Sequence, residues 1–224
     1  MRPRSTLLLV LAGEHGAERE VNDVGFDEIY ARARSDFAAV PWAELVAHPA
    51  LVASLDRQPP SLGRAALVIG CGLGDDAEEL ARRGFRVTAF DVSPTAIDWC
   101  RERFLASSVE YEVADLFGLP DAWRDAFDLV VEIRTLQSLP PSRRAVAVAA
   151  IAATVRRGGR VFVRCLARAD DDRWGSRPWP VSRRELAAFV DAGLAEVELV
   201  ERPAESGRGR SLTAVYVRHP PARG

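Results

Sequence analysis

One short stretch, residues 65–76, restricts the fold of this 224-residue chain more than any other feature. The five apolar residues 65–69 run directly into the sequence GCGLG at residues 70–74, and a helical pattern begins immediately afterwards. Glycine permits sharp backbone turns and lets a ligand lie against bare main chain. The stretch therefore predicts a buried strand that turns through a ligand-binding loop into a helix.

The glycine spacing and the two acids that follow it distinguish between cofactor types. The glycines form G-x-G-x-G, whereas nicotinamide and flavin enzymes use G-x-G-x-x-G. Asp75 and Asp76 place two carboxylates at the positive end of the helix, where a pyrophosphate would otherwise bind. They suit the zwitterionic amino-acid end of a sulfonium cofactor better than a pyrophosphate. A tight strand-to-helix turn without any ligand is the alternative interpretation.

Beyond residue 64, short β-branched runs alternate with longer amphipathic stretches. This alternation predicts a parallel sheet with helices on both faces. The expected strands are 65–69, 86–90, 109–113, 127–132 and 160–165, and the expected helices are 75–83, 94–104 and 142–155. Two further strand-like runs, 194–200 and 211–218, predict a hairpin. We expect an α/β, Rossmann-like, doubly wound sheet of seven mostly parallel strands with a C-terminal antiparallel hairpin.

The N-terminal part has a different pattern. Residues 25–56 show helical spacing that Pro41 divides into at least two pieces. We expect residues 25–224 to form a single domain in which residues 25–60 are a helical lid. Residues 1–24 are expected to be a leader that is disordered or over-annotated, and an extra strand or helix and a secretory signal are the alternatives.

Acidic residues follow three of the predicted strands. Asp91 comes at the end of the second strand, about 20 residues beyond the glycine loop, where a carboxylate can accept hydrogen bonds from ribose hydroxyls. Asp115 follows the third strand, and Glu132 ends the fourth. Because parallel strands end at the same edge of a sheet, we expect these acids around one crevice, which favours a cofactor site.

Residues 65–97 resemble the cofactor loop of class I S-adenosylmethionine-dependent methyltransferases, and most of all the thiopurine, halide/thiol and tellurite-resistance group. Those relatives often have V-P-G-C-G-x-G, and here Ile69 replaces the proline. The resemblance continues through the L-x-x-L-P-P-x-x-R run at 136–144, and residues 40–42 are similar to the Pro-Trp of an N-terminal lid. It implies a methyltransferase whose cofactor is S-adenosylmethionine.

The resemblance also implies which residues contact that cofactor. The glycine loop approaches the methionine part, Asp91 holds the ribose and Asp115 holds the adenine. The implied set is Trp42, Gly70, Cys71, Gly72, Gly74, Asp91, Val92, Ser93, Asp115, Leu116, Glu132, Ile133 and Leu136. Cys71 is interpreted as a loop residue and not as a nucleophile, and Trp42 is either a lid residue or a core tryptophan.

Methyl transfer from a sulfonium needs alignment and exclusion of water more than acid–base help. An oxygen nucleophile would usually need a general base, yet the chain contains no lysine and His48 lies in the predicted lid. The catalytic residue stays unassigned, and the acceptor is expected to be a thiol, a soft anion or an aromatic or heteroaromatic small molecule. Residues 168–181, with Trp174 and Trp179, are expected to form the acceptor chamber together with the N-terminal helices.

Two alternatives remain open for that chamber. The segment 168–181 is otherwise a solvated loop with anchoring tryptophans. Arg134 either orients an anionic acceptor or forms a salt bridge to a helix.

Charge and cysteine content exclude several other classes of protein. The formal net charge is −2, which gives no electrostatic case for a nucleic-acid or membrane partner. Three scattered cysteines favour neither a metal site nor a disulfide framework, so we expect a reduced, cytoplasmic protein without metal. A non-catalytic S-adenosylmethionine-binding protein and an NAD-dependent oxidoreductase are the alternative functions. The oligomeric state is not predicted.

Overall fold

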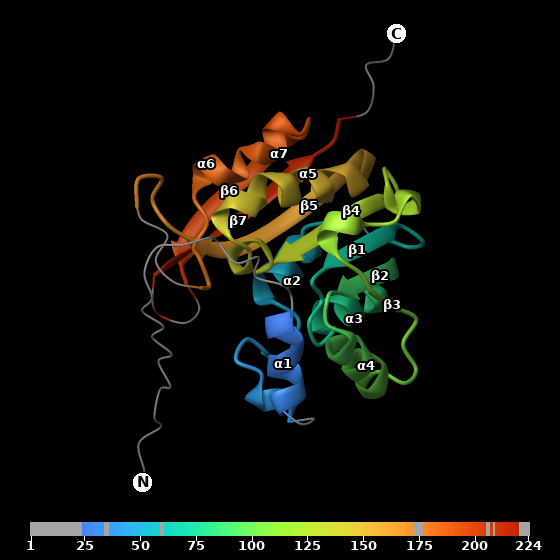
Figure 1. Ribbon diagram of the computed structural model, residues 1–224. Coiled ribbons are helices and arrows are strands. Elements are labelled where there is room, and N and C mark those ends of the chain that lie inside the picture. The colour runs from blue at the N-terminus through green and yellow to red at the C-terminus, as the bar shows by residue number, and fades with distance from the viewer. Residues whose placement is uncertain are drawn as a thin grey trace.

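The computed structural model describes residues 24–33, 36–58, 61–172, 177–204, 207 and 209–219. In these residues, one seven-stranded sheet has the order β3-β2-β1-β4-β5-β7-β6 (Figure 1). The strands are β1 (Ala65–Ile69), β2 (Arg86–Asp91), β3 (Glu110–Val113), β4 (Phe127–Ile133), β5 (Val155–Ala167), β6 (Ala195–Pro203) and β7 (Arg210–Val217). This arrangement confirms the predicted fold class.

The direction of the strands places a crevice in the middle of the sheet. Strands β1 to β5 pair in parallel, and β7 pairs antiparallel with both β5 and β6. The chain runs outward from β1 through β2 to β3 and then returns to place β4 on the other side of β1. Ligands of doubly wound sheets bind at such a reversal, outside the carboxyl ends of the strands.

Helices cover both faces of the sheet. The described helices are α1 (Val24–Ala33), α2 (Pro49–Asp56), α3 (Asp75–Arg82), α4 (Pro94–Arg103), α5 (Arg144–Thr154), α6 (Arg183–Leu186) and α7 (Ala188–Asp191). Helices α2, α3 and α4 bury their apolar residues against one face, and α5, α6 and α7 bury theirs against the other (Figure 1). No described helix has the length and apolarity needed to cross a lipid bilayer.

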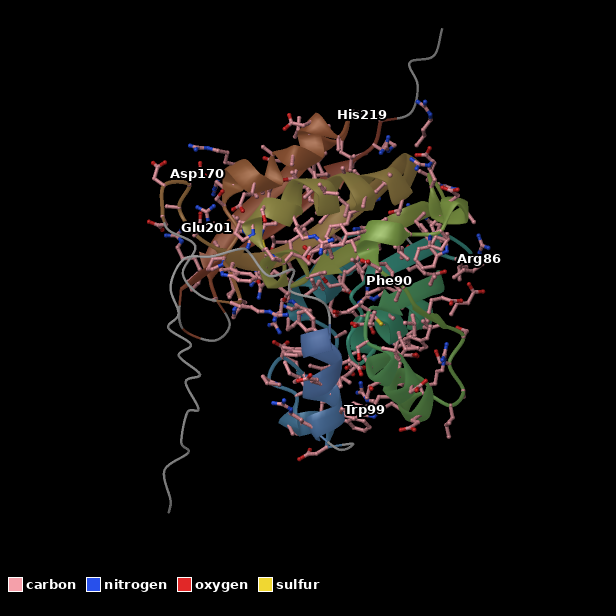
Figure 2. All side chains as sticks on the ribbon, viewed as in Figure 1. Arg86, Phe90, Trp99, Asp170, Glu201 and His219 are labelled. Carbon is pink, nitrogen blue, oxygen red and sulfur yellow. The ribbon has the colours of Figure 1, made fainter. Side chains whose placement is uncertain are left out.

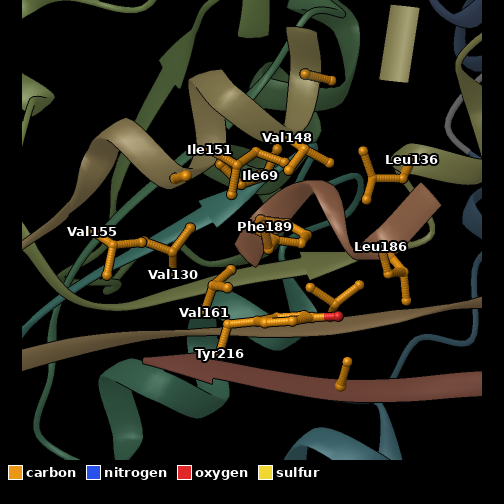
Figure 3. Packing of buried hydrophobic residues seen from close by; sticks show 14 of the residues in the cluster. Ile69, Val130, Leu136, Val148, Ile151, Val155, Val161, Leu186, Phe189 and Tyr216 are labelled. Atoms are coloured by element: carbon orange, nitrogen blue, oxygen red, sulfur yellow. The ribbon is translucent and has the colours of Figure 1, made fainter. Parts of the chain in front are cut away.

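The core beneath α5 and α7 is packed from large side chains (Figure 3). Phe189 of α7 stacks on Tyr216 of β7, with ring centroids 4.8 Å apart, and both rings are almost completely buried. Ile151 of α5 belongs to the same cluster and is also fully buried. Each such side chain contributes roughly 1.5–3 kcal/mol of hydrophobic stabilisation, so this face holds the antiparallel strands rigidly to the sheet.

The N-terminal region is helical at its two ends and irregular between them. Helix α1 is attached to the start of α4, because Asp27 accepts hydrogen bonds from Ser93 Oγ at 2.6 Å and from the Thr95 amide at 3.1 Å. A short 3₁₀ turn at Phe37–Ala39 follows, and residues 40–48, which we call the lid segment, lead into α2. Residues 1–23 lie outside the described residues, so the leader and the domain boundary remain predictions.

The fifth strand differs from its predicted form. The sequence predicts a helix that ends at residue 155 and a strand at 160–165, whereas β5 already begins at Val155, which pairs with Phe127. The glycines interrupt the strand without ending it: Gly158 has φ 78°, and the register shifts between Phe127 and Leu129. Most other predicted elements agree with the structure to within one or two residues at each end.

Candidate functional site

The glycine loop turns sharply, as its sequence predicts, and it does so through left-handed backbone. Gly70, Gly72 and Gly74 have φ values of 59°, 56° and 88°. A Cβ on Gly70 would lie 2.5 Å from Thr135 Oγ1, and one on Gly74 would lie 2.6 Å from Tyr111 Oη. Such approaches are too close for a carbon atom. Glycine is therefore required here both by backbone conformation and by space.

Asp91 joins the ends of β1 and β2. Its Oδ2 accepts the Gly72 amide proton and its Oδ1 accepts the Ser93 amide proton, each at 3.0 Å. A carboxylate oxygen has two lone pairs, so each oxygen can accept a further hydrogen bond from a ligand. Asp91 thus holds the loop in shape and also faces the cavity described next.

A cavity of about 470 Å³ opens at the carboxyl ends of the strands. The glycine loop, the ends of β2 and β4, the lid segment and the loop that contains Arg177 and Pro178 contribute to its wall. The predicted site residues that line it are Trp42, Gly70, Cys71, Gly72, Asp91, Val92, Asp115, Leu116, Ile133 and Arg134. The structure therefore brings most of the predicted cofactor residues together around one space.

Four predicted cofactor residues lie behind the wall instead of in it: Gly74, Ser93, Glu132 and Leu136. Gly74 precedes α3, and Ser93 caps α4 by accepting the Ala96 amide proton at 3.1 Å. Leu136 is 1% exposed and belongs to the core. These four residues therefore support the wall of the cavity from behind.

Glu132 is fully buried, and its surroundings alter its protonation. One oxygen accepts the Leu136 amide proton at 2.8 Å, and among the described residues the other oxygen has no hydrogen-bond partner. Burial raises the pKa of Glu132 to about 7, against the opposing effect of backbone hydrogen bonds and the nearby Arg144. Burial therefore favours the protonated form of this side chain.

Asp115 and Leu116 lie at the end of β3, on the wall of the cavity. Asp115 caps the short 3₁₀ turn Leu116–Gly118, because its Oδ1 accepts the Phe117 amide proton at 2.9 Å. Asp115 is exposed while Leu116 is buried. An acceptor oxygen beside an apolar side chain is the combination that an adenine ring requires.

The lid segment is attached through aromatic rings. Trp42 Nε1 donates to Tyr30 Oη at 3.1 Å, and Trp42 packs edge-to-face against both Tyr30 and Phe26. Trp99 of α4, which Figure 2 labels, extends the cluster, because its ring also packs edge-to-face against Tyr30. Trp42 packs in an aromatic cluster and also lines the cavity, so both interpretations of the sequence stay open. Tyr30 also lines the cavity but was not among the predicted site residues, because the spacing of residues 25–56 indicated only helix.

The two acids after the glycine loop have separate partners. Asp75 forms an ion pair with Arg103 at 2.8 Å, whereas Asp76 accepts the backbone amide proton of His48 at 2.7 Å. Burial is the main cause that raises the pKa of Asp76 to about 6, and the neighbouring Asp75 and Glu44 raise it further. Both aspartates line the cavity, so their charge faces any ligand there.

Arg134 lines the cavity, but its guanidinium also forms an ion pair with Glu44 of the lid segment. The structure thus shows a salt bridge of Arg134, as one interpretation predicts, although its partner Glu44 lies in an irregular segment and not in a helix.

Trp179 does not line the cavity. Its amide donates to the Gln137 carbonyl at 2.7 Å, and its carbonyl accepts from Arg144, so it is anchored through its backbone. Trp174 lies outside the described residues.

Two other expectations concern cysteine and metal. The neighbouring thiol of Cys100 and burial raise the pKa of Cys71 well above its ordinary value, which fits a loop residue and not a nucleophile. Across the described ranges, no group of three or more potential ligands is arranged to hold a metal ion. His48 caps α2, because its Nδ1 accepts the Ala50 amide proton at 3.1 Å.

Comparison with known proteins identifies a domain within the chain. Residues 66–159 match the family described as a methyltransferase domain. The ubiquinone biosynthesis O-methyltransferase of Aeromonas salmonicida (strain A449) is 34% identical over 110 residues, which are 48% of this chain and 45% of that protein. The chain therefore spans less than half the length of this relative.

Two solved structures share the fold. A TehB-like S-adenosylmethionine-dependent methyltransferase from Corynebacterium glutamicum is 22% identical with a TM-score of 0.62, over 88% of this chain and 100% of that one. The Burkholderia thailandensis 1,6-didemethyltoxoflavin-N1-methyltransferase, solved with 1,6-didemethyltoxoflavin and S-adenosylhomocysteine, is 20% identical with a TM-score of 0.67, over 88% and 86%. These two likenesses show a shared fold, and the family match over residues 66–159 agrees with the class-level resemblance. The narrower thiopurine, halide/thiol and tellurite-resistance group is not confirmed.

Proposed function

We propose that this chain, whose residues 66–159 match a methyltransferase domain, transfers a methyl group from S-adenosylmethionine to a small molecule. One observation carries the proposal: the left-handed glycine loop, Asp91 and Asp115 open onto the same cavity. The loop offers bare main chain to the methionine part of the cofactor. Asp91 accepts from the ribose and Asp115 from the adenine amino group.

The charge of the cavity supports a cationic cofactor. Its described wall contains five carboxylates, from Glu44, Asp75, Asp76, Asp91 and Asp115, but only the two guanidinium groups of Arg134 and Arg177. A sulfonium with a free ammonium group is attracted by this excess of acid. The pyrophosphate of a nicotinamide cofactor would be repelled by it.

The size and enclosure of the cavity favour a small acceptor. A space of about 470 Å³ lies in the range of small-molecule pockets, and the lid segment covers one side of it. The cofactor supplies the activated methyl group, and the protein aligns the acceptor and excludes water. Aromatic side chains from Phe26 and Trp42 suit a planar acceptor, so aromatic or heteroaromatic compounds join thiols and soft anions as candidates.

O-methylation is a second candidate because of Asp76. This carboxylate lines the cavity, and its pKa of about 6 lies in the range expected of a general base at neutral pH. The Aeromonas relative is named as an O-methyltransferase. If Asp76 removes the acceptor proton, methylation of a phenol should rise as the pH rises through about 6. The Asp76→Asn variant, which keeps an acceptor oxygen for His48, should lose that pH dependence.

Calorimetric titration with S-adenosylmethionine, S-adenosylhomocysteine and NAD tests the main proposal. We expect the first two to bind and NAD not to bind, with Asp91→Asn weakening binding about tenfold or more. The matched control is Asp98→Asn, which makes the same change at an exposed position of α4. Binding of NAD alone, or of none of the three, contradicts the proposal. Cofactor binding without methylation of any thiol, halide, phenol or heteroaromatic acceptor supports a non-catalytic binding protein.

A further inference from the structure

Arg134 connects the end of β4 to the lid segment, residues 40–48. Its guanidinium forms an ion pair with Glu44, and a second nitrogen donates to the Trp42 carbonyl at 3.4 Å. Ninety positions separate Arg134 from Glu44 in the sequence. The ion pair therefore joins two distant parts of the chain across the wall of the cavity.

The backbone around Arg134 directs its side chain. Arg134 has φ 68°, which is unfavourable for any residue with a Cβ. Its amide donates to the Arg164 carbonyl at 2.8 Å, and its carbonyl accepts from Ser138 Oγ at 2.9 Å. Strained conformations of this kind persist where surrounding contacts fix them, and they are concentrated at functional sites.

The lid segment has little structure of its own to hold it in place. Among the described residues, its one internal backbone hydrogen bond joins the Ala43 amide to the Val40 carbonyl at 3.1 Å. Its far end is fixed where the His48 amide donates to Asp76. Between these points Leu45 and Val46 are 39% and 62% exposed. Among the described residues, the ion pair between Arg134 and Glu44 is the ionic contact that holds the middle of the lid segment.

We infer that Arg134 is a positioning residue that acts through Glu44 to keep the lid segment closed over the cavity, and so controls how fast ligands leave. The inference rests on the proposed function only for the ligand used to measure release. Arg134 and Glu44 side chains are 31% and 37% exposed. A pair that exposed is partly screened by water, so its loss should change the closed population by a few-fold and not abolish closure.

Charge reversal separates this role from direct contact between Arg134 and a ligand. Arg134→Glu and Glu44→Arg each replace the attraction with a repulsion, whereas the double variant restores an ion pair with the charges exchanged. If Arg134 works by contacting the ligand, the double variant stays as defective as Arg134→Glu. If it works through Glu44, the double variant recovers. Arg57→Glu is the matched control, because it reverses one member of an exposed Arg57–Glu198 pair between α2 and β6.

The experiment measures the release of S-adenosylhomocysteine by rapid mixing and the hydrogen exchange of the Ala43 and His48 amides, which donate to Val40 and Asp76. We expect about three- to tenfold faster release and exchange in each single variant, recovery to within about twofold in the double variant, and no change in the control. Absence of recovery in both measurements, or unchanged exchange in the single variants, overturns the inference. If S-adenosylhomocysteine fails to bind the wild-type protein, the proposed function fails, and hydrogen exchange alone still decides the inference.

Discussion

Tyr111 occupies the space beside Gly74 that a side chain on this glycine would need. A Cβ on Gly74 would lie 2.6 Å from Tyr111 Oη, and this hydroxyl is fixed because it donates to Glu78 at 2.7 Å. We expect Gly74→Ala to destabilise the protein by about 2–4 kcal/mol, because the overpacking adds to the cost of a left-handed alanine. Chemical denaturation measures this change in the free energy of unfolding.

The matched control for Gly74→Ala is Gly63→Ala. Gly63 also has a positive φ, 71°, but a Cβ there would meet no atom within 4 Å. This control should lose only the conformational cost, about 1 kcal/mol. Equal losses in the two variants would show that Tyr111 moves aside and that the contact does not explain the requirement for glycine.

Glu132 makes the stability of the protein depend on pH. Burial raises its pKa to about 7, from an ordinary value of 4.5. The folded state therefore holds this proton more tightly than the unfolded state, and stability falls as the pH rises from 4.5 to about 7. The accumulated penalty above that range is on the order of 3 kcal/mol.

Glu132→Gln has no such proton to lose. Relative to the wild-type protein, this variant should gain up to about 3 kcal/mol in the free energy of unfolding between pH 4.5 and pH 8. Denaturant titrations at several pH values measure the difference, and Glu102→Gln, at an exposed position of α4, is the control. A difference that does not change with pH would mean that Glu132 is charged in the folded protein.

Much of the candidate site could be predicted from the sequence because its residues lie where parallel strands end, at one edge of the sheet. The glycines predicted a sharp turn after the first strand, and the parallel register brought Asp91 and Asp115 to the same edge as that turn. Glu132 shows where this reasoning stops. Successive residues of a strand face opposite sides of the sheet, so Ile133 lines the cavity while Glu132 is buried near Arg144 of α5.

The contacts of the lid could not be predicted from one sequence. The Arg134–Glu44 ion pair and the Asp76–His48 hydrogen bond join residues 90 and 28 positions apart. No local sequence pattern predicts either contact, because each contact depends on where an irregular segment crosses the folded sheet. The same limit applies to Tyr30, whose hydroxyl meets Trp42 only after α1 has packed against α4.

Asp27 attaches α1 to the start of α4. Its hydrogen bond with Ser93 Oγ lowers the pKa of Asp27, so the stability it contributes is present at neutral pH and is lost as the pH falls through the lowered value. Asp27→Ala should cost about 1–2 kcal/mol and expose α1 to protease. Limited proteolysis and thermal unfolding measure these effects.

Glu28→Ala is the comparison for Asp27→Ala, because Glu28 is the next residue of α1 and its ion pair with Arg32 is largely exposed. We expect it to cost less than about 0.5 kcal/mol. If α1 is cleaved equally fast in both variants, the contact between Asp27 and the start of α4 is not what holds the helix.

Arg144 holds together the wall of the cavity that carries Arg177 and Pro178. It is 2% exposed, pairs with Glu185 at 2.6 Å, and donates to the Leu136 carbonyl at 3.1 Å. It also donates to the backbone carbonyls of the two residues that follow Pro178. Arg144→Met leaves three backbone carbonyls without this buried donor and removes one of the two arginines that pair with Glu185, so it should cost about 3–5 kcal/mol.

Arg143→Met tests whether burial is the reason for this cost. Arg143 is the preceding residue and is exposed, with its guanidinium 3.6 Å from the centre of the Phe117 ring. Loss of that cation–π contact should cost at most about 1 kcal/mol. Because Arg144 fixes the backbone next to Pro178, its variant should also bind S-adenosylhomocysteine more weakly at temperatures where it is still folded. Equal stability of the two variants would mean that the carbonyls and Glu185 find other partners, and that Arg144 does not shape the cavity.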